Sequence, residues 1–205
     1  FESIIKDYKT DNTEIGLDVS EWQGDIDFNE LKKAGVEFVF IRVGGTKGTN
    51  GEYFLDKKFE QNIKNANEVG IPVGIYFYSY ANSNESAIND AKWVLELIKG
   101  YKIDLPIAFD WEDWGNYNFY KLSFFGLTDM ASSFLNIFKE AGYEGILYSS
   151  KNYLEQIWLK TDYPIWLAHY APKTSYQGNY TFWQICSDGK VPGIYGDVDI
   201  NIHYK

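Results

Sequence analysis

Short apolar segments alternate with longer amphipathic segments along most of the chain. The apolar segments are 15–20, 37–43, 71–80, 105–113, 145–150 and 163–170, and the amphipathic ones are 28–35, 55–70, 84–100, 125–142 and 151–158. Strands joined by helices produce this alternation, so it predicts successive βαβ units. Several of the predicted helices end in glycine, at Gly35, Gly70, Gly100 and Gly142, where a left-handed cap is expected.

The pattern changes after residue 170. The apolar segments 180–187 and 196–204 follow with turn-rich connections such as "SDGKVPGIYG", which leave no room for full helices. Eight candidate strands in this order predict an α/β fold, an irregular (β/α) barrel of the TIM type whose C-terminal third is poor in helices. A doubly wound open sheet is the alternative, although it ends less naturally in consecutive strands.

Length and composition narrow the class of protein. With 205 residues, 45% of them hydrophobic and 23% charged, the chain is predicted to form one globular domain and not a disordered segment. No apolar run approaches the ~20 residues that cross a bilayer, so membrane insertion is not expected. A net charge of -10 and a single arginine, Arg42, argue against nucleic acid as a partner. The one cysteine, Cys186, excludes an internal disulfide.

Polar residues close several of the predicted strands. In α/β barrels the reacting groups lie at the carboxyl ends of the strands. The residues that close strands in this chain are Asp18 and Ser20, Asp110 and Glu112, His169 and Tyr170, and Asp197, Asp199 and Asn201. If the barrel closes, the first and last strands become neighbours, which brings Asp18 and Asp199 together. His169 is expected to be a hydrogen-bonded structural residue, and Ser20 and Ser149 lack the neighbouring histidine of a nucleophile motif.

The segment "PIAFDWEDW", residues 106–114, places three acids within four positions, beside two tryptophans. Because side chains alternate along a strand, Asp110 and Glu112 share one face and Trp111 points the opposite way. Crowded carboxyls raise the proton affinity of at least one of them, and a protonated acid beside a carboxylate is the arrangement used in glycoside hydrolysis. A structural strand-end motif and a magnesium site are the alternatives. With two histidines and no H-E-x-x-H, a zinc site is not expected, and the prediction is for no metal and no cofactor.

Aromatic residues make up 19% of the chain, more than an aliphatic core requires. Their flat faces suit sugar rings, whose C–H bonds pack on the π surface. Tyr76, Tyr78 and Tyr80 share one face of a predicted strand, and the first two are expected to line a pocket. Trp114, Trp166 and Trp183 are candidates for either sugar platforms or core, and Trp93 for core. Arg42 closes the second strand and is expected to pair with an active-site carboxylate.

Seven motifs in order resemble a known family. They are "GLDVSEWQGDIDFNELKKAGVEFVFIRVGGTKG", "IPVGIYFYSYA", "LPIAFDWE", "GILYSS", "IWLAHY", "FWQICSDGKVPGI" and "DVDIN". Together they resemble the catalytic domain of glycoside hydrolase family 25, the Chalaropsis-type lysozymes. The resemblance implies an irregular β/α barrel and an N-acetylmuramidase, a peptidoglycan hydrolase that cleaves the β-1,4 bond between N-acetylmuramic acid and N-acetylglucosamine with retention. The alternatives are a non-catalytic glycan-binding barrel and a metal-dependent barrel hydrolase.

The resemblance also implies roles for particular residues. Glu112 corresponds to the general acid and then base, and Asp110 to either a nucleophile or the group that orients the substrate N-acetyl. Asp18 and Asp199 correspond to the acids that tune this pair and bind sugar. The expected substrate-binding residues are Tyr76, Tyr78, Tyr170, Trp114, Arg42 and Trp166.

The family pattern implies a division of the chain and a place of action. Residues 1–14 are expected to be an N-terminal extension, and residues 15–205 the catalytic domain. The partner is bacterial peptidoglycan, and the protein is expected to be a monomer that is secreted or associated with the cell wall, its signal or parent sequence lying outside this chain.

Overall fold

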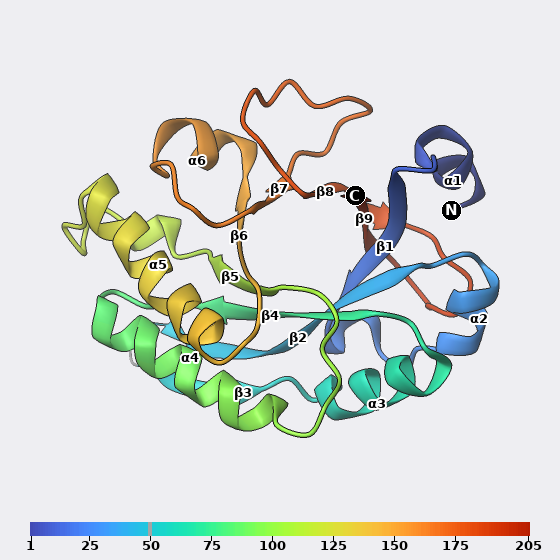
Figure 1. Ribbon diagram of the computed structural model, residues 1–205, viewed down its shortest axis with the longest axis horizontal. Coiled ribbons are helices and arrows are strands. Elements are labelled where there is room, and N and C mark those ends of the chain that lie inside the picture. Colours follow the sequence, from blue (N-terminus) through green and yellow to red (C-terminus); the bar gives the residue numbers. More distant parts are fainter. Residues whose placement is uncertain (49–50) are drawn as a thin grey trace.

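A closed eight-stranded barrel forms the centre of the computed structural model, which describes residues 1–48 and 51–205 (Figure 1). The barrel strands follow the order β1, β2, β4, β5, β6, β7, β8 and β9. Strand β1 pairs with β2 on one side and with β9 on the other, and this double pairing closes the barrel. The predicted irregular barrel is therefore confirmed, and the open doubly wound sheet is excluded.

The elements alternate along the chain until the last third. In order they are α1 (Glu2–Tyr8), β1 (Thr13–Val19), the 3-10 helix η1 (Glu21–Gln23), α2 (Phe28–Lys33), β2 (Phe38–Lys47), β3 (Glu52–Leu55), α3 (Phe59–Val69), β4 (Val73–Ser79), α4 (Asn84–Ile98), β5 (Ile107–Trp111), the 3-10 helix η3 (Trp114–Asn116), α5 (Phe124–Glu140), β6 (Gly145–Ser150), α6 (Lys151–Gln156), β7 (Ile165–Ala168), β8 (Phe182–Gly189) and β9 (Val198–Tyr204). Strand β3 pairs with the end of β2 and lies outside the closed barrel.

Strand β9 runs against its neighbours. The other barrel strands are parallel, whereas β9 is antiparallel to both β8 and β1. A connection as short as residues 190–197 joins antiparallel neighbours, since a parallel crossover needs a dozen or more residues. The prediction that Asp199 closes the last strand is therefore wrong, because Asp199 lies near the start of β9. The reversed direction still places it at the carboxyl end of β1, directly opposite Asp18.

Two apolar layers hold the barrel together. The interior contains Phe38, Phe40, Ala108, Ile146, Trp166 and Phe182, and a larger cluster fills the space between the barrel and its surrounding helices. A side chain at Gly74 would overlap the ring of Phe40, so β4 has a glycine where the aromatic ring needs room. Mostly aromatic side chains thus fill the part of the barrel towards the amino ends of the parallel strands. Polar side chains line the opening at the carboxyl ends.

Helices cover only part of the barrel. Figure 1 shows α3, α4 and α5 gathered on one side, near β2, β4 and β5, while loops without an α-helix join β7, β8 and β9. This arrangement confirms the predicted helix-poor C-terminal third. Helix α1, which the sequence pattern did not predict, lies beside this region, and the Tyr8 ring packs edge-on against Trp183 at 6.0 Å between centroids. The division into residues 1–14 and 15–205 stays a prediction.

The helix ends follow the local sequence. Gly35, Gly70, Gly100 and Gly142 all adopt positive φ, as expected for residues that end helices. Ser83 begins α4 with a capping box, in which its hydroxyl accepts a hydrogen bond from the backbone of Ser86. In residues 1–48 and 51–205, no helix combines the length and apolar character that crossing a membrane requires.

A buried acid ties helix α4 to the barrel. Asp90 is 3% exposed and accepts hydrogen bonds from Ser79 Oγ at 2.8 Å and from the Tyr53 hydroxyl at 3.1 Å. Ser79 Oγ in turn accepts the backbone N–H of Ala81, which fixes the direction of the Ser79 proton towards Asp90. Burial raises the pKa of Asp90 to about 6. This contact anchors the end of β4 immediately after the residues that face the site.

The raised pKa of Asp90 predicts a pH-dependent cost to stability. Between the unfolded pKa near 3.8 and the folded pKa near 6 the native state binds the extra proton, so stability falls as pH rises through this window. The wild type should lose stability over this range, whereas Asp90→Asn has no carboxyl to ionise. We therefore expect the difference in free energy of unfolding, Asp90→Asn minus wild type, to rise by up to about 3 kcal/mol between pH 4 and pH 7. Urea unfolding across this range measures the difference. The exposed Asp162→Asn is the control, and parallel pH curves for wild type and Asp90→Asn would contradict the prediction.

Candidate active site

Four acidic side chains meet at the carboxyl-end opening of the barrel. Asp18 comes from β1, Asp110 from β5, Glu112 from the residue after β5, and Asp199 from the start of β9. The first, second and fourth line a cavity of about 200 Å³. Glu112 lines a neighbouring cavity of about 360 Å³. The structure thus brings together all four acids that the sequence singled out, although β9 delivers Asp199 from the opposite direction.

Asp18 is held by two amide groups. Its Oδ2 accepts a hydrogen bond from Gln184 Nε2 at 2.8 Å and another from Asn201 Nδ2 at 2.7 Å. Trp166 Nε1 donates to Asn201 Oδ1 at 2.8 Å, which turns the amide nitrogen of Asn201 towards Asp18. N–H donors favour the ionised form of a carboxyl group. The surroundings of Asp18 are therefore built for a carboxylate.

Two tyrosines orient Gln184 in the same way. The hydroxyls of Tyr148 and Tyr170 donate to Gln184 Oε1 at 2.8 and 2.9 Å. With both donors on the oxygen, the amide nitrogen must face Asp18. Both tyrosines line the cavity of Asp18 and also the cavity of Glu112. The hydrogen-bond network therefore extends from Asp18 to the boundary between the two cavities.

Asp18 and Asp199 form the first acid pair. They lie directly opposite each other on antiparallel strands, where facing side chains approach closely. Burial raises the pKa of Asp18, while hydrogen bonds from Asn201 and Gln184 act in the opposite direction. Burial, and then the charge of Asp18, raises the pKa of Asp199 to about 9. Because the amide donors face Asp18, Asp199 holds the proton at neutral pH and Asp18 carries the charge.

Asp110 and Glu112 form the second acid pair. Burial raises the pKa of Asp110 well above its ordinary value, and the adjacent Glu112 raises it further. Burial also raises the pKa of Glu112. Asp110 Oδ1 is buried and has no hydrogen-bond partner among residues 1–48 and 51–205. Burial therefore favours a protonated carboxyl in this pair, and one carboxyl oxygen of Asp110 is free to accept a hydrogen bond from a ligand.

The residues beside this pair are structural. Trp111 is 1% exposed, belongs to the cluster outside the barrel, and donates from Nε1 to the carbonyl of Ala81 at 2.7 Å. Its direction confirms the predicted alternation along the strand. Asp113 accepts hydrogen bonds from Asn116 Nδ2 and the Tyr120 hydroxyl, so it holds the loop that follows β5. Of the three acids in this segment, Asp110 and Glu112 face the site and Asp113 supports the backbone.

Arg42 lines the cavity, but its partner differs from the expectation. The prediction that it pairs with one of the four site acids is wrong, because its Nε donates to Asp56 Oδ2 at 2.8 Å. The same oxygen accepts the backbone N–H of Glu21 at 3.0 Å. Asp56 precedes α3 and is 1% exposed, so sequence spacing gave no signal of this pairing. Arg42 acts on the site through its charge, which lowers the pKa of Asp110 and opposes the effect of burial.

Some of the predicted aromatic residues line the two cavities, and others support the residues that do. Tyr76, Tyr78 and Tyr170 line the cavity of Asp18, as expected for a ligand-binding wall. Trp166 is 1% exposed and stacks on Phe40 at 4.2 Å, so it forms the floor and orients Asn201. Trp114 borders the cavity of Glu112, with one face covered by Tyr153 at 3.7 Å.

The remaining candidates have structural partners. Trp183 is buried at 3% exposure, and half-buried Trp93 packs against the core and stacks on Tyr53. His169 Nδ1 lies 2.8 Å from Thr174 Oγ1, in agreement with a hydrogen-bonded structural role. Ser20 caps η1, and Ser149 accepts a hydrogen bond from Trp158 Nε1.

Sequence reasoning missed several residues of the site. Tyr148, Gln184 and Trp22 line the cavity of Asp18. Tyr148 and Gln184 lie within the apolar segments "GILYSS" and "FWQICS". A polar residue inside a predicted strand is the signal that could have identified them. Trp22 follows the first strand in "DVSEWQG", in the loop position where barrel enzymes place functional residues.

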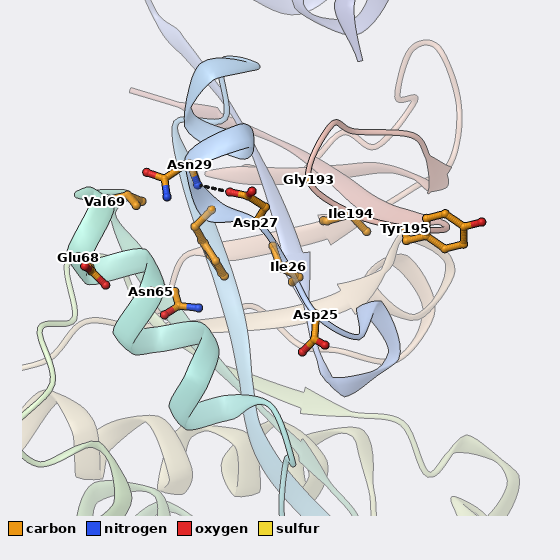
Figure 2. Close-up of a pocket in the computed structure, with 11 residues that line it drawn as sticks. Asp25, Ile26, Asp27, Asn29, Asn65, Glu68, Val69, Gly193, Ile194 and Tyr195 are labelled. Carbon is orange, nitrogen blue, oxygen red and sulfur yellow. Dashed lines mark hydrogen bonds between the residues drawn. The ribbon is translucent and has the colours of Figure 1, made fainter.

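A larger cavity lies elsewhere. It has a volume of about 880 Å³ and runs between α2, α3 and the β8–β9 loop (Figure 2). Two of its acids are already engaged in the fold, since Asp27 accepts the backbone N–H of Asn29 at the start of α2 and Asp25 pairs with Lys58 at 2.5 Å. None of the four site acids lines it. Acid chemistry therefore belongs to the smaller pair of cavities.

The acids do not form a metal-binding cluster. In residues 1–48 and 51–205, no group of three or more His, Cys, Asp or Glu side chains is arranged to hold a metal ion. Amide and hydroxyl donors surround Asp18, where a cation site would present further oxygen acceptors. The donor set favours acid–base chemistry carried by the chain's own side chains.

Comparison with known proteins gives consistent results. The sequence model described as Glycosyl hydrolases family 25 matches residues 17–194. Lysozyme M1 of Streptomyces globisporus is 31% identical over 205 residues, which cover 91% of this chain and 66% of that protein.

Solved structures agree with the sequence match. The modular autolysin LytC from Streptococcus pneumoniae, solved in complex with a synthetic peptidoglycan ligand, has a TM-score of 0.82 and 30% identity over 96% of this chain. A family 25 glycosyl hydrolase from Bacillus anthracis has a TM-score of 0.78 and 28% identity, covering 97% of this chain and 92% of that one. The present chain spans 48% of LytC, about half its length.

Proposed function

Because the chain belongs to glycosyl hydrolase family 25 and is therefore a glycoside hydrolase, we propose that it cleaves bacterial peptidoglycan at the β-1,4 bond between N-acetylmuramic acid and N-acetylglucosamine. The observation that carries the proposal is the meeting of two acid pairs at one opening of the barrel. Burial raises the pKa of the acids in both pairs, and amide donors favour the charge on Asp18, so the site can supply both a proton donor and negative charge, as glycoside hydrolysis requires.

Glu112 is the general acid in this proposal. Burial raises its pKa, which favours the protonated form, and it is more accessible than Asp110. It transfers this proton to the glycosidic oxygen as the C–O bond breaks, and the electron pair of that bond stays with the leaving sugar. As a carboxylate, Glu112 then removes a proton from the water that completes hydrolysis.

Asp110 acts on the N-acetylmuramic acid, the sugar whose anomeric carbon reacts. Its free Oδ1 is placed either to attack the anomeric carbon or to accept the N–H of the substrate N-acetyl group, whose carbonyl oxygen then attacks. The negative charge of Asp18, held by two amide donors, stabilises positive charge that develops on the sugar ring. Asp199 keeps a proton and hydrogen-bonds to Asp18, so it adjusts the charge of the site without adding a second anion.

In this proposal the two cavities determine which way the glycan strand runs through the site. A general acid lies beside the leaving group, so the leaving N-acetylglucosamine occupies the cavity of Glu112. The N-acetylmuramic acid that becomes positively charged occupies the cavity of Asp110, Asp18 and Asp199. That cavity, at about 200 Å³, is smaller than the ~300 to 1,000 Å³ of pockets for drug-sized ligands and fits a single sugar ring.

The partner of the protein in this proposal is the glycan strand of the bacterial cell wall. Its place of action is outside the cytoplasm, secreted or associated with the wall, and it works as a monomer. The net charge of -10 gives no electrostatic attraction to an anionic wall, so shape and sugar contacts carry recognition.

Turbidity of purified peptidoglycan tests the proposed activity. We expect the protein to clear the suspension at similar rates with and without EDTA, because its own carboxyls supply the acid and the charge. Binding without clearing would favour a non-catalytic glycan-binding barrel. Loss of clearing in EDTA, restored by Mg²⁺, would favour a metal-dependent hydrolase.

We further expect hydrolysis with retention of configuration at the anomeric carbon. Asp110 and Glu112 are separated by one residue, and closely spaced carboxyls leave little room for a water to attack directly. Retaining pairs lie about 5 to 5.5 Å apart, against roughly 6.5 to 9.5 Å for inverting pairs. NMR of the first reducing ends released from a soluble peptidoglycan fragment measures the outcome. The β-anomer should form first, and initial α-anomer would contradict the assignment of Asp110.

A further inference from the structure

An exposed tryptophan stands at the rim of the cavity that contains Asp18 and Asp110. Trp22 is 79% exposed and lines this cavity, although it does not line the cavity of Glu112. In the described part of the chain, no other aromatic ring stacks on it. The indole therefore presents a free aromatic face directly beside the cavity of Asp18 and Asp110.

The backbone under Trp22 is held firmly. Ser20 and Gln23 form a capping box around η1, in which Ser20 Oγ accepts the N–H of Trp22 and Gln23 Oε1 accepts the N–H of Ser20. Asp56 accepts the N–H of Glu21 at 3.0 Å. The indole therefore projects from a turn whose backbone is already fixed, so no backbone ordering is needed when a ligand covers it.

Gln23 also ties this turn to the other side of the opening. Its Nε2 donates to the carbonyl of Asp197 at 3.2 Å, immediately before β9 and Asp199. The turn that carries Trp22 is thereby fixed relative to both acids of the Asp18 pair. A sugar on the indole would have a defined position relative to the reacting ring.

We propose that Trp22 is the stacking platform for the N-acetylglucosamine that precedes the cleaved N-acetylmuramic acid on its non-reducing side. This inference rests on the proposed function, which puts the leaving sugar on the side of Glu112. Trp22 borders only the other cavity, so the sugar that continues the strand from there meets the indole first. The C–H face of a pyranose packs on an indole face, while its hydroxyl groups remain in water.

Equilibrium binding to a Glu112→Gln background tests the platform without relying on hydrolysis. The probes are the tetrasaccharide GlcNAc-MurNAc-GlcNAc-MurNAc and the trisaccharide MurNAc-GlcNAc-MurNAc, which lacks the preceding sugar. We expect Trp22→Ala to raise the Kd of the tetrasaccharide about 5- to 10-fold and to change that of the trisaccharide less than twofold. Trp22→Phe should recover most of the affinity because it restores an aromatic face.

Tyr195→Ala is the matched control. Tyr195 is fully exposed and lines the separate large cavity, where Figure 2 shows its ring projecting from the β8–β9 loop. It should leave both Kd values unchanged, and thermal melting should show that all variants fold. An unchanged tetrasaccharide Kd in Trp22→Ala, an equal loss for both probes, or no binding of either probe would overturn the platform. Failure of the wild type to cleave the tetrasaccharide, with the binding differences intact, would instead refute the proposed hydrolysis.

Discussion

Replacement of Glu112 by Gln is expected to lower the kcat for peptidoglycan hydrolysis by about 10² to 10⁴. The amide keeps the shape of the side chain but has no proton to transfer to the glycosidic oxygen. KM should change little, because the substrate contacts remain. Initial rates on a soluble glycan fragment, measured together with the binding of that fragment, separate the two effects.

The fold should survive this substitution. Burial raises the pKa of Glu112, so the native site already disfavours its charge, and a neutral amide removes that cost. We therefore expect thermal stability equal to or above that of the wild type. The exposed Glu140→Gln on α5 is the matched control and should keep full activity. Wild-type activity in Glu112→Gln would refute its assignment as the general acid.

Replacement of Asp110 by Asn should lower kcat by about 10² to 10³. In either route the substitution replaces the carboxyl group that would attack the anomeric carbon or orient the N-acetyl group. Asp110 is buried with its pKa raised, so the amide should again be tolerated by the fold. Kinetics and thermal melting of the same preparation measure both consequences.

Asp113→Asn gives the opposite pattern within the same segment. Asp113 is 4% exposed and accepts hydrogen bonds from Asn116 and Tyr120, so its amide variant loses charge-assisted contacts that hold the loop. We expect lower thermal stability and most of the activity retained. If Asp110→Asn behaved like Asp113→Asn, Asp110 would be a structural residue and not part of the reaction.

The alternation of apolar and amphipathic segments predicted the barrel because each strand and each helix must bury its own apolar surface. The strand-end rule then selected Asp18, Asp110, Glu112 and Asp199 as candidates, and all four line the two cavities at one opening. Tyr76, Tyr78 and Tyr170 followed from period-two alternation and from polar residues closing a strand. The roles assigned to these residues remain proposals that the variants above test.

Other features depend on contacts between segments far apart in the chain. The sequence by itself determined where most strands and helices form and that Asp18, Asp110 and Glu112 lie at or just after strand ends, since these follow from local spacing of side chains. Only the tertiary structure decided that β9 runs antiparallel, that Arg42 pairs with Asp56, and that Gln184 and Asn201 both face Asp18. Local periodicity cannot specify these pairings, because each arises when barrel closure brings together residues from different strands and when burial makes every polar group find a partner.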